Sequence, residues 1–520
     1  MRKREKMRKG SLMVKWVLIL VINSIIIMEL LVVIEGYGEN SILHHHDHHS
    51  VYHGGGDDHI MRKMQAFKAS LLQRPPSLLV SPAPAYPQSP VTGTAKSAGV
   101  YHVSNYGADP TGKMDSTEAL LKVFTEVANG ASNGVLMEGI ANLGGVEISL
   151  DGGEYLISRP LMFPKTGLGN ILIHGGTLHA SDSFPSDRFL IELSSSPSTK
   201  SQETTASFGQ KLSSAPSSYN FEFVTFKDLL LDCNYRGGGI AVINSLRVGI
   251  DNCYITHFGT AGIHVQGGHE TLIRSSFIGQ HITAGADPGE RNFTGTGIIL
   301  HGNDNVVSDV VIFSAATGVM VSGQANLISG VHCYNKATSF GGTGIYLKLP
   351  QLTQTRIVNS YLDYTGIVAE DPVQLIVSNN FFLGDAFITL KSIKGVANGV
   401  NIVDNMFSGS GKGVDIVQLD GQFGNVDQVV IDRNNVDGMN VKATIARVAV
   451  QGNGSSWTAD FNRILLFPNL IKHVQYTLRT GGDLFPVHAL RNVSDNRVTI
   501  VSNLASPTSV YVMVDQGFGS

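Results

Sequence analysis

A short phrase, Gly-Ile-x-Val, recurs through the second half of the chain and constrains its fold more than any other feature. Its copies begin at Gly239, Gly262, Gly297, Gly318, Gly344 and Gly366, and we align two further copies at Ala386 and Gly413. A second phrase alternates with the first and begins at Ile250, Ile273, Ile357, Val377 and Val403. Two phrases in every 20 to 35 residues predict two or more strands in each repeat.

Each phrase alternates apolar residues with variable ones, as strands with one buried face do. A repeat of this length cannot bury that face alone, so successive repeats must stack. With 58 Gly and only 15% charged residues, the composition suits short strands and tight turns better than long amphipathic helices. The Leu/Asn spacing of leucine-rich repeats is absent, and propeller blades are about twice as long. The sequence therefore predicts an all-β chain built as a parallel β-helix.

The chain before residue 100 resembles a targeting segment followed by a spacer. Six Lys or Arg among the first ten residues precede an apolar run from Trp16 to Ile34, which predicts that residues 1–36 are a signal peptide. An uncleaved membrane anchor is the alternative. Residues 37–99 are His-rich and then Pro-rich, which predicts a disordered spacer, although a His tract can also bind transition metals.

The folded part is expected to divide into residues 100–440, the β-helix, and residues 441–520, a small C-terminal β cap. Near its start, Asp115 or Ser116 can cap a short helix that runs to about Ala128 and closes one end of the stack. Three Cys allow at most one internal disulfide. Cys233 with Cys253 is the favoured pair, and three unbridged buried thiols are the alternative.

Charge and short motifs narrow the class of partner. Loss of residues 1–36 removes seven Lys/Arg and three Asp/Glu, which changes the formal net charge from −4 to −8. An acidic protein of this kind is not expected to bind nucleic acid, because phosphate contacts need a basic surface. Acceptor motifs for N-glycosylation begin at Asn292, Asn453 and Asn492, in keeping with secretion.

The segment Val103-Ser-Asn-Tyr-Gly-Ala-Asp-Pro-Thr-Gly-Lys-Met-Asp-Ser-Thr-Glu-Ala119 resembles the opening of pectin-lyase-like β-helix proteins. The stretch Leu229–Tyr235, which leads into glycines 237–239, adds to the likeness. Among these proteins, the chain from about Val100 onward resembles the plant QUARTET-type polygalacturonases, divergent relatives of glycoside hydrolase family 28 associated with pollen-tetrad separation. The resemblance implies a right-handed β-helix, secretion to the cell wall, and hydrolysis of α-1,4-linked galacturonan in pectin.

The chain departs from the motifs of typical family members, which are Asn-Thr-Asp, Asp-Asp, Gly-His-Gly and Arg-Ile-Lys in that order. None of the four is intact within residues 100–520. Gly384-Asp385 and Tyr346-Leu-Lys348 match fragments of two motifs, but in reversed order. No catalytic role is therefore carried over through them.

The aligned repeats themselves indicate a surface for substrate. With the phrase glycine as position zero, positions +2 and +4 point outward on each coil. They are His264 and Gln266, Ile299 and His301, Met320 and Ser322, Tyr346 and Lys348, and Val368 and Glu370. Sugar rings stack on Tyr, whereas His, Gln and Lys can hold hydroxyl or carboxylate groups. The column predicts that His264, Gln266, His301, Tyr346, Lys348 and Glu370 bind substrate; an ordinary solvated face is the alternative.

Candidate catalytic carboxylates lie beside this column. Position +7 places His269 next to Asp304 on the adjacent coil, and the one spacing of 35 residues inserts a loop that carries Asp287 and Glu290. Inverting glycosidases need an acid and a base about 6.5–9.5 Å apart, which adjacent or next-nearest coils supply. We predict that Asp304 acts with Asp287 or Glu290, the loop raising one pKa by desolvation.

Two alternatives to this catalytic pair stay open. Asp304, between Asn303 and Asn305, can instead be a turn residue whose side chain bonds its own backbone. A second carboxylate cluster, Glu370 with Asp371 and Asp385, is the fallback site.

Three functions follow from these residues and the resemblance. The first is a secreted, monomeric glycosidase that binds pectic polysaccharide in the cell wall and needs neither metal nor cofactor. It would have no stable membrane association unless the leader stays uncleaved. The second is a Ca²⁺-dependent pectate lyase on the same scaffold, and the third is a non-catalytic wall-binding protein.

Overall fold

The computed structural model describes residues 99–194, 219–281, 293–334, 341–348 and 354–517, apart from residues 482 and 484. These residues belong to the compact unit Thr94–Ser520, which is distinct from Met1–Gly93. The expected signal peptide, residues 1–36, and all of the 37–99 spacer except Gly99 lie outside the described residues. No helix within the described ranges is long and apolar enough to cross a membrane.

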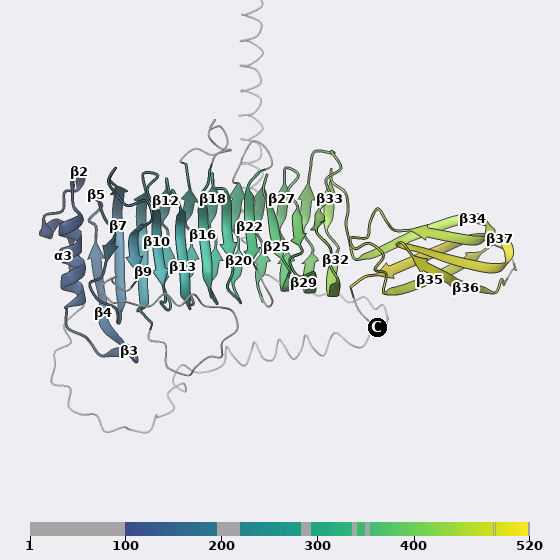
Figure 1. The fold of residues 1–520 in the computed structure, drawn as a ribbon, viewed down its shortest axis with the longest axis horizontal. Coiled ribbons are helices and arrows are strands. Elements are labelled where there is room, and N and C mark those ends of the chain that lie inside the picture. Colours follow the sequence, from purple (N-terminus) through teal and green to yellow (C-terminus); the bar gives the residue numbers. More distant parts are fainter. Residues whose placement is uncertain are drawn as a thin grey trace, which may run out of the picture. The chain divides into compact units, whose positions relative to one another are not determined.

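Each coil of the β-helix contributes three strands, which stack in parallel on their counterparts in the next coil (Figure 1). We name the three stacks A, B and C in chain order. Stack A contains the glycine phrases and forms a ten-stranded sheet. Its strands are β6 (Leu161–Met162), β8 (Phe189–Leu193), β10 (Gly238–Ile243), β13 (Ala261–His269), β16 (Thr296–Asn303), β19 (Thr317–Val321), β22 (Thr343–Lys348), β25 (Gly366–Glu370), β28 (Ile388–Lys391) and β31 (Val417–Asp420).

Stack B follows stack A in each coil. Its strands are β4 (Ile140–Ser149), β7 (Leu168–Ala180), β9 (Phe221–Asp232), β11 (Gly249–Asp251), β14 (Leu272–Arg274), β17 (Val306–Ser308), β20 (Leu327–Ser329), β23 (Arg356–Val358), β26 (Val373–Ser378), β29 (Val396–Val403) and β32 (Asn425–Asp432). At its first coil, β1 (Val100–His102) pairs in parallel with β4, and β3 (Val135–Met137) pairs antiparallel with β4.

Stack C completes the coil. It starts with β2 (Thr111–Asp115) and β5 (Glu154–Ile157) and continues through the second halves of the long strands β7 and β9. Its later strands are β12 (Tyr254–Thr256), β15 (Phe277–Gly279), β18 (Val311–Phe313), β21 (His332–Tyr334), β24 (Tyr361–Asp363), β27 (Phe381–Leu383), β30 (Met406–Ser408) and β33 (Asn435–Asp437).

The second sequence phrase thus spans two strands, one in stack B and one in stack C. A residue with positive φ, such as Asn252 (φ 50°) or Asn379 (φ 56°), turns the chain between them. Just after this turn, buried or half-buried asparagines of successive coils bond to one another. The Asn380 amide donates to Oδ1 of Asn405, and that of Asn405 donates to Oδ1 of Asn434, each at 3.0 Å. The ladder satisfies polar groups that the tight turn buries.

Glycine at position zero of stack A is explained by the close approach of neighbouring coils. A Cβ added at Gly262 would lie 2.7 Å from the Gly297 carbonyl oxygen and 2.6 Å from a methyl group of Ile278. Gly297 meets the Gly318 carbonyl in the same way, also at 2.7 Å. Since real Cβ contacts are longer, any side chain at either position would force the coils apart.

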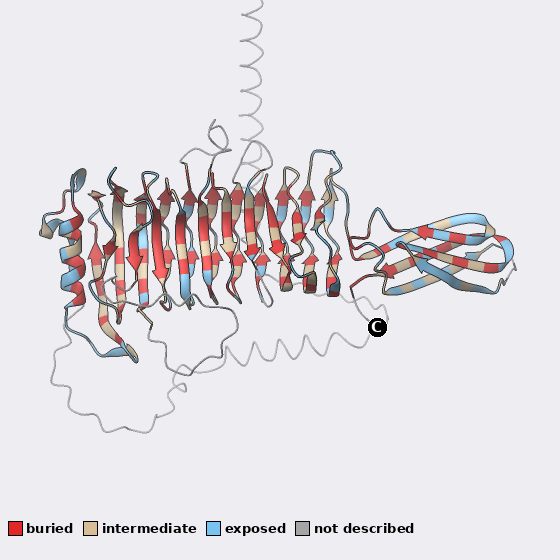
Figure 2. Ribbon diagram, in the orientation of Figure 1, coloured by how far each residue is buried: buried red, intermediate tan, exposed pale blue. Residues whose placement is uncertain are grey.

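The register corrects three of the aligned phrases. Ile388 pairs with Ile367, so Phe387, not Ala386, occupies position zero, and Val417 pairs with Ile388, so the next zero is Ile416, not Gly413. In the second phrase, Ile402 rather than Val403 pairs with Val377. Alternation of buried and more exposed residues along the strands sets the register (Figure 2). In β28, Ile388 and Leu390 are both fully buried.

The two ends of the solenoid are closed as expected. Helix α3 (Thr117–Ala128) follows the 3₁₀ turn η1 (Val103–Tyr106). Ser116 is its N-cap residue, although the Ser116 side chain makes no capping bond, and Oδ1 of Asp115 accepts a hydrogen bond from the Thr117 amide at 2.9 Å. At the other end, β34 (Ile445–Asp460), β35 (His473–Thr480), β36 (His488–Ser494) and β37 (Arg497–Asp515) form an antiparallel sheet with its own core.

The predicted fold class is confirmed: a parallel β-helix with a capping helix and a C-terminal β cap. The three cysteines are buried and unbridged, so the favoured Cys233–Cys253 disulfide is not formed and the alternative of free thiols holds.

Candidate active site

The outward side chains of stack A form the candidate site, which we call the A face. Burial follows the predicted alternation, because Ile263 and Val265 are fully buried whereas Gln266 is exposed. The register aligns His264 with Ile299, and Gln266 with His301, on neighbouring coils. It aligns Tyr346 with Val368, and Lys348 with Glu370, further along. The six predicted substrate-binding residues therefore share one face of one sheet.

A cluster of Tyr346, Lys348, Glu370 and Lys391 occupies the C-terminal part of the A face, on β22, β25 and β28, and we call it the Tyr-Lys cluster. The Tyr346 hydroxyl donates to Oε1 of Glu370 at 2.5 Å, and Nζ of Lys391 lies 3.2 Å from the same oxygen. Nζ of Lys348 lies 5.6 Å from the centre of the Tyr346 ring, and that of Lys391 lies 5.8 Å from it. A ring with two ammonium groups beside it offers both a stacking surface and positive charge.

The hydrogen bonds within this cluster hold its charges in place. The hydrogen bond to Tyr346 raises the pKa of Lys391, and the bond to Glu370 raises it further, so Lys391 stays cationic. Burial and the hydrogen bond to Glu370 raise the pKa of Tyr346, so the hydroxyl stays protonated as a donor. These bonds hold Tyr346, Glu370 and Lys391 relative to one another, and the exposed Lys348 adds a second ammonium group beside the ring.

Two histidines lie on the coils before this cluster. The rings of His264 and His301 pack edge to face with centroids 5.3 Å apart, and Phe189 packs 5.9 Å from His264. Burial and the neighbouring His301 lower the pKa of His264, while burial and Lys348 lower that of His301. Both rings therefore favour the neutral form, which can donate and accept a hydrogen bond. Nε2 of His264 is buried and has no partner among the described residues.

The predicted neighbour of Asp304 is where the repeat alignment placed it. Nδ1 of His269 lies 2.9 Å from Oδ2 of Asp304. Asp304 itself has a positive φ of 57° in the turn after β16, and its side chain is 50% exposed. Asp304 therefore lies in a turn, as the alternative interpretation expected, and its carboxylate is hydrogen-bonded to His269. Asp287 and Glu290 lie outside the described residues.

The fallback carboxylate cluster is not a cluster in the structure. Asp371 is buried and accepts hydrogen bonds from the backbone amides of Ile393, Lys394 and Val396. Asp385 accepts bonds from the amide and hydroxyl of Ser410. Both therefore stabilise turns, and only Glu370 of the three belongs to the Tyr-Lys cluster.

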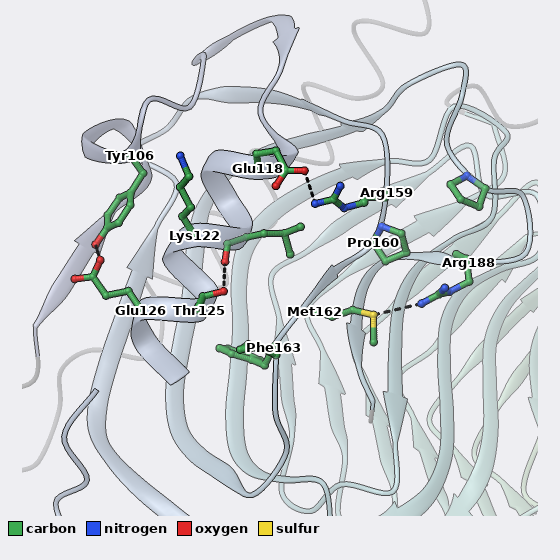
Figure 3. Close-up of a pocket in the computed structure, with 13 residues that line it drawn as sticks. Tyr106, Glu118, Lys122, Thr125, Glu126, Arg159, Pro160, Met162, Phe163 and Arg188 are labelled. Atoms are coloured by element: carbon green, nitrogen blue, oxygen red, sulfur yellow. Dashed lines mark hydrogen bonds and ion pairs between the residues drawn. The ribbon is translucent and has the colours of Figure 1, made fainter. Parts of the chain in front are cut away.

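A hollow of about 860 Å³ lies at the first coils of stack A, between α3 and the strands β6 and β8 (Figure 3). Its two guanidinium groups already have carboxylate partners, because Arg159 pairs with Glu118 and Arg188 bonds Glu192 at 2.7–2.8 Å. Phe163 and Met162 form its apolar floor. Lys122 also lines the hollow, which therefore offers one ammonium group, whereas the Tyr-Lys cluster offers two beside an aromatic ring.

Sequence reasoning missed three charged residues of the A face. With the corrected register, Lys391 and Asp420 are the +4 residues of β28 and β31, and Glu192 is the +2 residue of β8. The alternation Ile388-Thr-Leu390 could have revealed Lys391, since it marks the buried positions without any glycine. Glu370 and Asp420 lie on next-nearest coils, about 10 Å apart at the backbone. No cluster of metal-ligating side chains occurs among the described residues.

The stacked coils and the A face together define a parallel β-helix protein whose outer surface suits a carbohydrate polymer that carries negative charge. No protein-family model matches the chain. The chain is, however, 63% identical over 465 residues to polygalacturonase QRT3 of Arabidopsis thaliana, an alignment that covers 88% of this chain and 92% of that protein. The chain therefore belongs to the family of QRT3-type polygalacturonases.

Solved structures with similar folds are far more distant in sequence. The tailspike protein of the Escherichia coli bacteriophage HK620, solved with a hexasaccharide, is 9% identical, with a TM-score of 0.42 over 80% of this chain and 93% of that one. The A-module of the mannuronan C-5 epimerase AlgE4 of Azotobacter vinelandii is 17% identical, with a TM-score of 0.37 over 65% of this chain and 96% of that one. No conclusion about function or site follows from similarities this weak.

Proposed function

We propose that the protein is a polygalacturonase that hydrolyses α-1,4-linked galacturonan in the pectin of the cell wall. The observation that carries this proposal is the 63% identity to polygalacturonase QRT3 over nearly the whole of both chains. The A face supports it, because every galacturonate unit carries a carboxylate and the Tyr-Lys cluster offers two ammonium groups beside one aromatic ring.

The Tyr-Lys cluster is the proposed subsite for one sugar and its neighbour. The Tyr346 ring supports the apolar face of a sugar, and Lys348 and Lys391 bind uronate carboxylates. His264, Gln266 and His301 continue the face on preceding coils, where the neutral imidazoles bind hydroxyl groups. Since Glu370 already accepts bonds from Tyr346 and Lys391, its proposed role is to position these two side chains.

The proposed chemistry is inverting hydrolysis by two carboxyl groups, with Asp304 acting together with Asp287 or Glu290. One group protonates the leaving oxygen while the other removes a proton from the attacking water. His269 would orient Asp304 through the 2.9 Å contact. Glu370 with Asp420 is the competing pair, because both lie on the A face itself with Lys391 between them.

One assay separates hydrolysis from its alternatives. The purified protein is incubated with polygalacturonate, with and without a chelator, while reducing ends and ultraviolet absorbance are followed. New reducing ends without absorbance, unaffected by the chelator, are expected for a hydrolase. Absorbance that the chelator abolishes would identify a Ca²⁺-dependent lyase, and neither signal with retained binding would leave a non-catalytic binding protein.

We also propose that the protein is secreted to the cell wall as a monomer after removal of residues 1–36, with residues 37–99 as a spacer before the β-helix of residues 100–440 and the cap of 441–520. The basic, apolar leader and the exposed acceptor residues Asn453 and Asn492 support secretion. N-terminal sequencing of the protein from culture medium and light scattering of the purified protein test these points. A role in pollen-tetrad separation, implied by the resemblance, is part of the same proposal.

A further inference from the structure

The outer surface of stack C carries aromatic rings in contact from coil to coil. Tyr254 and Phe277 face outward on neighbouring strands, with ring centroids 6.1 Å apart. Further along, Tyr361 lies 4.8 Å from His332 on one side and 5.9 Å from Phe381 on the other. The rings form a column parallel to the direction in which the coils stack.

A second column joins these two groups, and its central ring, Phe313, is covered by its neighbours and only 4% exposed. Phe313 stacks on Tyr334 at 5.8 Å and reaches Tyr254 at 6.3 Å, and Tyr334 packs 4.8 Å from His332. Gly279 makes this possible, because a Cβ there would clash with the Phe313 ring. We call the seven connected rings the aromatic strip: Tyr254, Phe277, Phe313, His332, Tyr334, Tyr361 and Phe381.

The strip is exposed at several points and almost free of charge. Phe277 is 50% exposed and Phe381 is 45% exposed. The described strands from β12 to β30 in stack C contain no Lys or Arg, and Asp363 is their one acidic residue. Burial raises the pKa of Asp363 and lowers that of His332, which shifts both groups toward their uncharged forms. Contiguous exposed apolar surface is a common feature of binding sites.

We propose that the aromatic strip is an accessory binding site for uncharged, methyl-esterified stretches of galacturonan. This inference rests on the proposed function, which makes pectin the substrate. Methyl esters remove the charge from the uronate groups, and the C–H faces of sugar rings pack on aromatic rings. An ionised uronate would lose water at the strip without gaining a cation.

The geometry of the strip favours a polymer over a small ligand. Its rings recur on successive coils at steps of about 4.8 Å, so an extended chain lying along the solenoid meets one ring after another, except at β18, where Phe313 is buried. The strip would hold esterified pectin while the A face acts on de-esterified stretches, which the lysines of the Tyr-Lys cluster select. The two faces thus match the two charge states of one polymer.

The test compares two polymers that differ only in charge: highly methyl-esterified pectin and polygalacturonate made from it by saponification. Affinity electrophoresis measures binding of the wild-type protein and of the Tyr361→Ala/Phe381→Ala variant. We expect the variant to bind the esterified polymer about tenfold more weakly, since truncated aromatic anchors cost this much. Hydrolysis of short oligogalacturonates should stay unchanged. Phe485→Ala, which removes a 91% exposed ring of the C-terminal cap, is the matched control.

Several outcomes would overturn the inference. Equal retardation of wild type and variant, or no retardation of wild type by esterified pectin, would exclude the accessory site. A wild-type dimer that the variant loses would show that a second copy of the chain covers the strip. If the double variant fails to fold by circular dichroism, Phe277→Ala replaces it, because this ring contacts only Tyr254 of the strip. Failure of wild type to hydrolyse oligogalacturonates would reject the proposed function and leave the binding result standing.

Discussion

The A face and the aromatic strip are built from the same coils yet differ in almost every outward residue. Beneath both surfaces, a buried residue of each coil packs on the equivalent residue of the next coil, as Ile298 does in stack A and Ile312 does in stack C. Outward, the A face presents Lys348, Glu370 and Lys391, whereas the strip presents aromatic rings. In a solenoid, inward positions therefore determine the fold while each outer face is free to acquire its own chemistry.

The connections between strands differ in the same way. Stacks B and C are joined by short turns, as where Asn252 and Cys253 link β11 to β12. Connections that begin or end at stack A are longer: residues 194–220 join β8 to β9, 280–295 join β15 to β16 and 335–342 join β21 to β22. The last two run from stack C to stack A, so insertions occur at both borders of stack A, while the border between stacks B and C keeps its short turns.

The largest effect is expected from Asp304→Asn. An amide cannot transfer the proton, so kcat on polygalacturonate should fall by about 10² to 10⁴, with the strip's binding of esterified pectin unchanged. The matched variants Glu370→Gln and Asp420→Asn test the competing pair. Near-normal turnover by Asp304→Asn together with inactive Glu370→Gln and Asp420→Asn would move the chemistry to the competing carboxylates.

A second prediction concerns the charge of the A face. Lys348→Met with Lys391→Met removes both ammonium groups near Tyr346, and each lost ion pair should weaken uronate binding, raising KM by about tenfold or more in total. Initial rates over a range of oligogalacturonate concentrations measure this. Lys227→Met, an exposed lysine aligned with stack B, is the control. A KM that is unchanged in the double variant would remove the Tyr-Lys cluster from the binding site.

A smaller effect is expected from Tyr346→Phe. The change removes the hydroxyl that donates to Glu370 but keeps the ring, so kcat/KM should fall only about two- to fivefold. Tyr361→Phe, the equivalent change on the strip, should leave hydrolysis unaltered. An equal loss in both variants would contradict the separation of the two faces.

The smallest effects concern histidines and the free energy of unfolding as a function of pH. The folded pKa of His264 lies below its usual 6.5, so the unfolded chain binds more protons just below pH 6.5 and acidification there destabilises the fold. The free energy of unfolding of His264→Gln should therefore fall less than that of the wild type on acidification. His179 lies at the start of stack C, and its hydrogen bond to Asp232 raises the pKa of the ring above 6.5. The stabilisation that the protonated ring gives the fold is therefore complete below pH 6.5 and is lost as the pH rises through the folded pKa. His179→Gln should therefore destabilise mainly at acidic pH.

Urea unfolding at several pH values from 5 to 8 measures both effects. If the free energy of unfolding of both variants changed with pH in the same way as that of the wild type, neither ring would titrate as its surroundings require. Lys165→Met, which alters an exposed side chain after β6, is the control for changes in net charge.

The sequence predicted the fold because glycine spacing and apolar alternation both record how coils pack. The same alignment correctly placed His269 beside Asp304. It failed where a coil lacks the glycine: Ala386 was aligned with the glycine of the other phrases, although the buried pair Ile388 and Leu390 sets the register. Lys391 and Asp420 were missed for this reason.

Other features of the candidate site depend on three-dimensional contacts that spacing does not encode. Asp371 follows Glu370 directly, yet it turns inward to three backbone amides while Glu370 faces outward. The sequence pattern could have indicated part of the strip, because the second phrase ends in an aromatic residue at Tyr254, Phe277, Tyr361 and Phe381. The pattern does not encode the ring contacts of Phe313 that Gly279 permits. The one-residue shift at Val403 also hid that Met406, not Phe407, faces outward.

The central claim is that galacturonan is bound and cleaved on the A face. A crystal structure of the Asp304→Asn variant with a galacturonate oligomer tests it most directly. We predict a sugar ring over Tyr346, with uronate carboxylates within ion-pair distance of Lys348 or Lys391 and the scissile bond near residue 304. An oligomer bound along stack C or in the hollow beside α3, with the A face empty, would contradict it.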